Sequence, residues 1–256
     1  MTYSLIKREF MKKLCALIMI LIFTDTAYGQ MAPSSPPPPP PPIFVPQYYP
    51  LLHPGIIFTP LISWYSVINN PGDPNRSYAA NNGAHGGFTI GATFNQMFTP
   101  NYGIEVDPEY ELSGGDITHS YNYNGTNYSI DYNLHLQYLD LPVAFKFETN
   151  AIGYEKYFLR IGGTPKLSVG NRADVDTSIA GGPKHPTVDN VLVRQEITPI
   201  NLMLFIGGGF EYNLAGNTSL LVGLNYEAGV VNVWRVSSDN LNIKNHILSL
   251  NLGILF

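Results

Sequence analysis

The sequence has a single cysteine and few charged side chains. Charged residues make up 13% of its 256 residues, about half the share in an ordinary globular chain. Cys15 lies in an N-terminal segment that we expect to be removed, so the mature chain would carry neither a free thiol nor a disulfide. A mature chain without a thiol is excluded from thiol catalysis, and the low share of charged residues bears on the fold. Together with 17 tyrosines and 24 glycines, this low share favours a wall of β-strands over a helical core.

Long apolar runs are also missing. The run LCALIMILIF at residues 14–23 has ten residues, whereas a spanning helix needs about 20. Two lysines precede this run, and the tripeptide AYG that follows offers small residues for cleavage, which predicts a signal peptide over residues 1–29. Its removal moves the formal net charge from −5 to −7, which argues against nucleic acid as a partner.

A proline-rich segment follows the predicted cleavage site, and we assign residues 30–56 to a linker. Pro36 to Pro42 are seven consecutive prolines, which lack backbone N–H donors and favour an extended polyproline II rod. Such a rod serves either as a stiff spacer or as a motif that docks into an aromatic-lined groove of a protein partner.

Helical periodicity with capping residues is absent from residue 57 onward, and strand-like runs take its place. Their number is even, as a bacterial membrane barrel requires. We count eight such runs, at residues 57–69, 85–98, 102–112, 128–147, 157–170, 199–213, 218–233 and 243–256.

These runs alternate with period two between an apolar face and a face of charge and glycine. The chain ends in HILSLNLGILF, in which Leu248, Leu250, Leu252, Ile254 and Phe256 share one apolar face. A soluble sandwich also alternates, so alternation alone does not separate it from a membrane barrel. Strand length and loop length separate the two folds. The runs are longer than the usual five or six residues of a strand, and short connections alternate with long ones, as in a membrane barrel.

Aromatic residues gather near the strand ends, where a lipid interface favours amphipathic rings. We therefore predict an all-β fold, an eight-stranded antiparallel up-and-down transmembrane β-barrel over residues 57–256, in the bacterial outer membrane with both the N-terminal arm and the C-terminus in the periplasm. The residues expected at the interface are Trp64, Tyr65, Tyr102, Tyr128, Tyr132, Tyr157, Tyr212 and Trp234.

Four segments resemble the PorT-like outer-membrane β-barrel domains common in Bacteroidetes. They are YGIEVDPEYELSGG (102–115), YLDLPVAFKF (138–147), FIGGGFEYNL (205–214) and LSLNLGILF (248–256). The resemblance covers about residues 60–256 and leaves out the proline-rich arm. It implies an eight-stranded barrel of the porin family, whose members mostly have no defined biochemical activity.

Charged residues on the inward face are the candidate functional groups. Because an eight-stranded interior is just wide enough for side chains to fill, we expect these groups to pair and close the lumen, with a narrow ion path as the alternative. The predicted network comprises Glu105, Asp107, Glu109, Glu111, Lys146, Arg160 and Lys166.

The sequence offers no pattern for an enzyme, a metal or a cofactor. The six histidines have no ligand spacing, and the glycines of IGGG (206–209) follow no strand-to-helix transition, so they thin a strand for packing. The acidic row of the third run lies along one wall with no cleft marked opposite it. We therefore expect a non-enzymatic protein with no cofactor and no metal.

Two functions remain open, an anchor or binding platform in the outer membrane and a small passive pore for ions or solutes. The expected partners are outer-membrane lipid, the barrel assembly machinery and, through the proline-rich arm, a periplasmic protein of an envelope or secretion complex. We predict that Leu252, Ile254 and Phe256 form a C-terminal assembly signal, because an exposed terminal strand can be paired by strand addition before the barrel closes.

Overall fold

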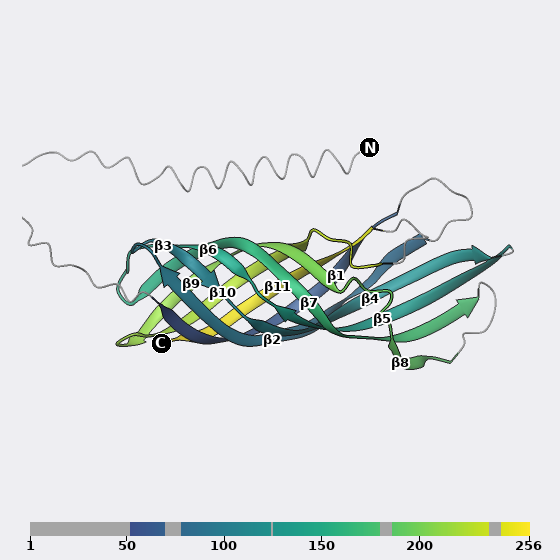
Figure 1. Cartoon of the computed structure of the whole chain (residues 1–256), viewed down its shortest axis with the longest axis horizontal. Coiled ribbons are helices and arrows are strands. Elements are labelled where there is room, and N and C mark those ends of the chain that lie inside the picture. Colours follow the sequence, from purple (N-terminus) through teal and green to yellow (C-terminus); the bar gives the residue numbers. More distant parts are fainter. Residues whose placement is uncertain (1–51, 70–77, 124, 180–185, 236–241) are drawn as a thin grey trace, which may run out of the picture. The chain divides into compact units, whose positions relative to one another are not determined.

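The structure is a computed structural model that describes residues 52–69, 78–123, 125–179, 186–235 and 242–256. The predicted signal peptide and most of the predicted linker lie outside the described residues. No helix in the described ranges is long and apolar enough to cross a membrane. The described elements are β1 (His53–Ile68), β2 (Tyr78–Met97), β3 (Tyr102–Val106), β4 (Glu109–Tyr123), β5 (Thr126–Asp140), β6 (Val143–Glu148), β7 (Glu155–Ile179), β8 (Val188–Leu192), β9 (Ile200–Ala215), β10 (Thr218–Gly229) and β11 (Asn242–Leu255) (Figure 1).

These strands form a closed antiparallel ring. β1 pairs with β2 on one side and with β11 on the other, so the first and last strands join (Figure 1). Around the ring, β2 pairs with both β3 and β4. β3 pairs with β6 and β4 pairs with β5, and both β5 and β6 pair with β7. β9, β10 and β11 then follow β7 in the ring. Counting β3 with β4 and β5 with β6, eight barrel strands result, and the predicted fold class is confirmed.

Two of the predicted strands are interrupted by proline. Pro108 separates β3 from β4, and Pro142 separates β5 from β6, because proline has no N–H to give to the ladder. The neighbouring backbone still bonds across each break: Asp107 N–H donates to the Pro142 carbonyl at 3.0 Å, and Leu141 N–H donates to the Pro165 carbonyl at 3.0 Å. The breaks therefore bend the wall without opening it.

The apolar face of each strand points outward. On β11, Leu248, Leu250, Leu252 and Ile254 are 37% to 46% exposed, whereas Ile247, Ser249 and Asn251 between them are buried in the lumen. The same alternation runs through β9, where Leu202, Leu204 and Ile206 face outward and Met203 and Phe205 face inward. A band of exposed Leu, Ile, Val and Phe on a closed barrel is the surface that lipid covers.

Aromatic rings lie at both ends of this apolar band. At one end, the outward Trp64 stacks on His246 with ring centroids 5.8 Å apart, and Tyr226 shares a hydrogen bond of 2.9 Å with His246. At the other end, Tyr102, Tyr157 and Tyr212 are exposed. Three interface predictions were wrong: Tyr65 (1% exposed) and Trp234 (6% exposed) are buried inside the barrel, and Tyr132 packs against Trp234 there. The chain brings Trp234 back into the barrel mouth from the β10–β11 connection.

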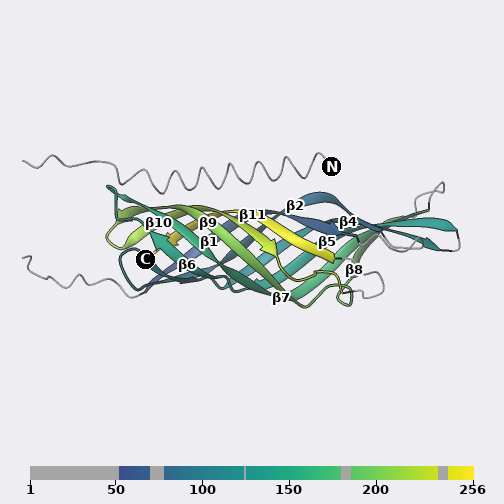
Figure 2. The same cartoon turned by 90° about the horizontal axis from the view of Figure 1, so that it is seen from above.

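The two ends of the barrel differ. Short connections and the C-terminus lie at one end, which we call the short-turn end, and β4, β5 and β8 project at the other, which we call the loop end (Figures 1 and 2). The expected long connection after the third run is largely strand, because β4 reaches Tyr123 and β5 begins at Thr126. Likewise, residues 171–198 are not a plain loop: β7 continues to Ile179, and β8 pairs with β7.

Candidate functional site

The lumen of the barrel holds three groups of buried ion pairs, each centred on one cation. The first is centred on Lys146 of β6, which is fully buried. Its Nζ lies 2.5 Å from Glu211 Oε1, 3.1 Å from Glu105 Oε2 and 3.3 Å from Glu148 Oε1. Three different strands thus supply the carboxylates that compensate one buried ammonium.

The second group is centred on Arg160 of β7. Its Nη1 pairs with Glu105 and lies 3.2 Å from Asp107 Oδ2, while its Nε donates to Asn225 Oδ1 at 3.0 Å. Glu105 therefore bridges the Lys146 and Arg160 groups. Only β6 separates β3 from β7, and only β9 separates β7 from β10, so each contact of Arg160 passes over one intervening strand inside the lumen. Together these contacts link β7 with the segment after β3 and with β10, two positions on opposite sides of the ring.

The third group is centred on Lys166, further along β7. Its Nζ pairs with Glu111 and lies 3.0 Å from Asp140 Oδ2 and 3.8 Å from Glu227 Oε2. Ser113 adds a hydroxyl that donates to Glu111 at 2.5 Å. Groups that share charges in this way hold strands β4, β5, β7 and β10 together from inside, where little solvent competes.

The glycines of the IGGG segment give these side chains their space. A Cβ on Gly207 would lie 1.8 Å from Asn225 Oδ1, and a Cβ on Gly209 would lie 2.9 Å from the Phe158 ring. A larger residue at either position would displace a side chain that fills the lumen. The glycine-rich segment thus lies in strand β9 and thins the wall.

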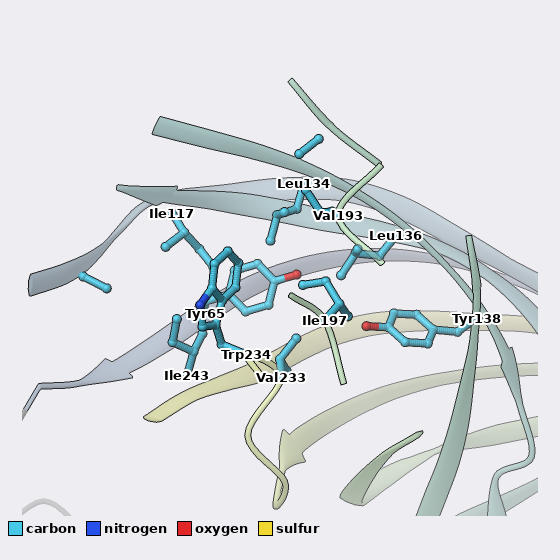
Figure 3. Close-up of a cluster of buried hydrophobic side chains, with 12 residues drawn as sticks. Tyr65, Ile117, Leu134, Leu136, Tyr138, Val193, Ile197, Val233, Trp234 and Ile243 are labelled. Carbon is cyan, nitrogen blue, oxygen red and sulfur yellow. The ribbon is translucent and has the colours of Figure 1, made fainter. Parts of the chain in front are cut away.

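An apolar cluster closes the loop end of the lumen, and we call it the loop-end cluster (Figure 3). Four of its members come from connections: Val193 and Ile197 lie between β8 and β9, and Val233 and Trp234 lie between β10 and β11. The two connections bond to each other, since Thr198 N–H donates to the Val233 carbonyl at 2.8 Å. Its buried residues are Tyr65, Ala79, Ile117, Leu134, Leu136, Tyr138, Ala173, Val193, Ile197, Val233, Trp234 and Ile243.

The projecting strands beyond this cluster carry polar side chains. Asp174 of β7 accepts a hydrogen bond of 2.8 Å from the Asn190 backbone N–H and lies 3.2 Å from His135 Nε2. These two contacts hold the pKa of the Asp174 carboxyl below its usual range. The first of them fixes β8 against β7, so the projection is an ordered sheet in the described part of the chain.

The structure brings most of the predicted network together. Glu105, Asp107, Glu111, Lys146, Arg160 and Lys166 all lie in the three groups, whereas Glu109 is half-buried beside the cavity described below. Sequence reasoning left Asp140, Glu148, Glu211 and Glu227 out of the network. Strand parity could have found them, since each shares the inward face of its strand, but parity does not tell which strands meet across the lumen.

The loop-end cluster has no comparable signal in the sequence. Val193, Ile197 and Val233 stand in connections without period-two alternation, and only the folded chain brings them into the barrel mouth. The predicted assembly residues Leu252, Ile254 and Phe256 lie outward on β11, which pairs fully with β1 and β10. Phe256 N–H donates to the Pro54 carbonyl at 2.8 Å, so the last residue is fixed to the first strand.

A closed ring of strands with a lipid-facing apolar band defines a barrel of the outer-membrane type. The chain belongs to the family described as the outer membrane protein beta-barrel domain, whose model matches residues 56–235. No curated protein matches the chain.

Several solved structures of outer-membrane proteins are similar to this chain. The outer membrane protein OprG from Pseudomonas aeruginosa is 12% identical with a TM-score of 0.41, and the match covers 80% of this chain and 96% of OprG. Neisserial surface protein A is 14% identical with a TM-score of 0.36, and 78% of this chain and 97% of that protein are covered. The attachment invasion locus protein Ail of Yersinia pestis, in complex with a heparin analogue, is 13% identical with a TM-score of 0.34, and 80% of this chain and 99% of Ail are covered.

Proposed function

We propose that this protein is a non-enzymatic anchor and binding platform of the outer membrane, with its loop end outside the cell and its termini in the periplasm. The observation that carries the proposal is the filled lumen. Between the charged groups lies a cavity of only about 10 Å³, lined among others by Asp107, Arg160 and Asn225, which holds about one water molecule. A solute path would need a continuous water-filled channel.

The loop-end cluster supports the same reading. An apolar cluster across the mouth of the barrel excludes water, and the charged groups behind it are engaged with one another rather than with solvent. What the protein presents to its surroundings is then the projecting sheet of β4, β5, β7 and β8. The proline-rich arm that precedes β1 in the sequence is the second segment that we propose to meet a partner. We place the chain with the PorT-like barrels, in keeping with the sequence resemblance of residues 102–115 and 138–147.

The alternative function is a small passive pore for ions or solutes, and planar-bilayer recording separates the two. We expect the wild-type protein to give no stable conductance. Reproducible steps that change when Asp107→Asn and Arg160→Gln neutralise the lumen would favour the pore and overturn the platform. Removing the side chain of Trp234 alone should not produce conductance, because the charged groups still fill the lumen.

A second experiment tests whether the proline-rich arm binds a periplasmic partner. In a chain whose residues 33–46 are replaced by a glycine-serine linker of equal length, we expect the barrel to insert normally but to lose a periplasmic partner that co-purifies with the wild type. The matched linker keeps the number of residues in the arm and removes its polyproline conformation. If co-purified proteins are the same for both chains, the arm is a spacer and not a binding segment.

A further inference from the structure

The lumen contains more buried negative charge than positive charge. In the described residues, six carboxylates are buried (Glu105, Asp107, Glu111, Asp140, Glu148 and Glu211), against the three buried cations Lys146, Arg160 and Lys166. Each cation is already shared by two or three carboxylates. Buried carboxylates are stable only when they are paired, protonated or bound to a metal ion, so an excess of three requires an explanation.

The excess coincides with a cavity. The space of about 10 Å³ described above is lined by three carboxylates, Asp107, Glu109 and Glu227, and by one cation, Arg160. Arg160 is itself occupied by Glu105, Asp107 and Asn225. Glu227 lies 3.8 Å from Lys166, which Glu111 and Asp140 also share, so the negative charge around the cavity is only partly compensated.

The same cavity is lined by oxygen atoms that have no hydrogen-bond partner. They are Oγ1 of Thr59, Oγ of Ser249, Oδ1 of Asn251 and Oδ1 of Asp107, and all four side chains are at most 4% exposed. A carboxylate oxygen and an amide oxygen can only accept, so each needs a donor or a positive ion. Leaving such atoms unpaired inside a protein is unfavourable.

Apolar residues enclose this cavity along the barrel. On β1, the inward Thr59 lies between Ile57 and Leu61, and Leu61 packs with Met203 and Ile247 in one buried cluster. On β11, Ser249 and Asn251 lie between Ile247 and Leu255, which packs with Phe158 and Leu221 in another cluster. Bulk water is thus kept from the unpaired oxygens, and whatever satisfies them must occupy the cavity.

We infer that this cavity is a binding site for one dehydrated monovalent cation, such as Na⁺, held by Asp107 with the oxygens of Thr59, Ser249 and Asn251. Carboxylate, hydroxyl and amide oxygens are ligands that hard cations prefer. The volume accommodates one atom of about the size of water. A divalent ion is disfavoured, because the four proposed ligands include a single carboxylate.

A cation explains the cavity better than a water molecule does. A water molecule would supply two donors to the unpaired oxygens, but it would add no positive charge beside Asp107 and Glu227, whose partners Arg160 and Lys166 are already shared with other carboxylates. The bound ion would link β1, β11 and the segment after β3 from inside, and it would reduce the excess of three buried negative charges to two. The inferred cation site goes beyond the proposed anchor and platform function, because it concerns an ion bound inside the closed barrel.

The experiment compares cations at constant ionic strength and constant pH. The full chain is refolded into detergent micelles in choline chloride, NaCl, KCl or tetramethylammonium chloride, with the ion present from the start because the folded lumen is closed. Thermal unfolding is followed by circular dichroism. We expect the unfolding midpoint to rise with NaCl and to saturate, and to stay level in choline and tetramethylammonium. Equal midpoints in all four salts would overturn the site.

Two further results distinguish a bound cation from protonated carboxylates and test Asp107 as the ligand. A midpoint that follows pH in every salt, without any dependence on the cation, would mean that the carboxylates hold protons, and it would overturn the cation site. In Asp107→Asn, which removes the charged ligand, we expect the NaCl concentration at half-saturation to rise at least about tenfold. Ser249→Ala is the milder variant should Asp107→Asn fail to fold, and it should shift the same concentration in the same direction.

The matched control is Asp176→Asn, which removes a carboxylate from the loop-end part of β7, away from the cavity. We expect its dependence on NaCl to equal that of the wild type. If Ser249→Ala and Asp107→Asn respond to NaCl as Asp176→Asn does, the ion binds elsewhere, and the assignment of this cavity is wrong.

Discussion

At the scale of single residues, the stability of the lumen depends on cations that several carboxylates share. Lys146 is fully buried and contacts Glu105, Glu148 and Glu211. Lys156 also contacts Glu148, at 3.5 Å, but its side chain is 42% exposed. The two lysines thus form ion pairs with the same acid in different surroundings, which allows a matched comparison.

We predict that Lys146→Met destabilises the barrel by about 3–5 kcal/mol, because it leaves buried carboxylates without their cation. Lys156→Met should change stability by less than about 1 kcal/mol, because solvent screens an exposed pair. Urea unfolding of the refolded protein in detergent gives both free energies. A small effect of Lys146→Met would mean that the carboxylates around it are protonated in the folded protein.

At the scale of elements, the connections at the loop end act as part of the interior. Trp234 belongs to the loop-end cluster (Figure 3) and packs edge-on against Tyr132, with ring centroids 5.4 Å apart. Trp64, in contrast, lies outward against His246. The two tryptophans of the chain therefore have opposite surroundings. Substituting each tryptophan in turn tests whether the loop-end cluster or the outward aromatic residues hold the β8–β9 and β10–β11 connections in place.

We predict that Trp234→Ala loosens the β8–β9 and β10–β11 connections, with a local loss of about 3–5 kcal/mol for a buried aromatic side chain. Hydrogen exchange should increase in residues 193–198 and 231–235 and stay slow in β9 and β10. Trp64→Ala is the control, and it should leave exchange in those connections unchanged. Uniformly faster exchange throughout the barrel in Trp234→Ala would contradict a local role of the cluster.

The terminal strand β11 combines a lipid-facing role and the proposed assembly role. Leu252→Asp places a charge on the lipid-facing side, which should destabilise the inserted barrel by up to about 2 kcal/mol. We expect both Leu252→Asp and deletion of Phe256 to lower the amount of inserted protein in cells, with Leu252→Val as the control that keeps the apolar face. Unchanged insertion of the Phe256 deletion would reject the assembly signal.

At the scale of the whole molecule, closure of the ring determines how stable the folded barrel is in detergent and on heating. Pairing of β1 with β11 leaves no free edge in the barrel wall, and the ion pairs across the lumen resist opening. We expect a barrel closed in this way to stay folded in mild detergent at room temperature and to unfold on heating, when the ion pairs of the lumen and the ladder hydrogen bonds break together.

We therefore predict that the purified protein in detergent shows a strand-dominated circular dichroism spectrum and migrates faster on a gel before heating than after it. The heated sample is the internal control, because it differs only in the state of the barrel. A monomer that stays soluble in plain buffer without detergent would contradict the lipid-facing assignment of the apolar band.

The parity of each strand could be read from the sequence, because side chains alternate between the two faces of any strand. This local rule placed Leu248, Leu250, Leu252, Ile254 and Phe256 outward and Glu105, Lys146 and Arg160 inward, and the exposed fractions of these side chains agree with it. Strand ends were less certain: β4 and β5 extend into what resembled a polar loop, since polar residues also form strands when a neighbouring strand satisfies their backbone.

Only the tertiary structure decided which groups meet. Lys146 reaches Glu211, and Arg160 reaches Asp107, each over one intervening strand inside the lumen. Both contacts depend on the register and stagger of strands far apart in the chain. The burial of Trp234 depends on the path of a connection, which no periodic pattern describes. The sequence by itself thus determined the barrel and its two faces, because these follow from local alternation. The filled lumen and the closed mouth follow from long-range contacts, which only the folded ring creates.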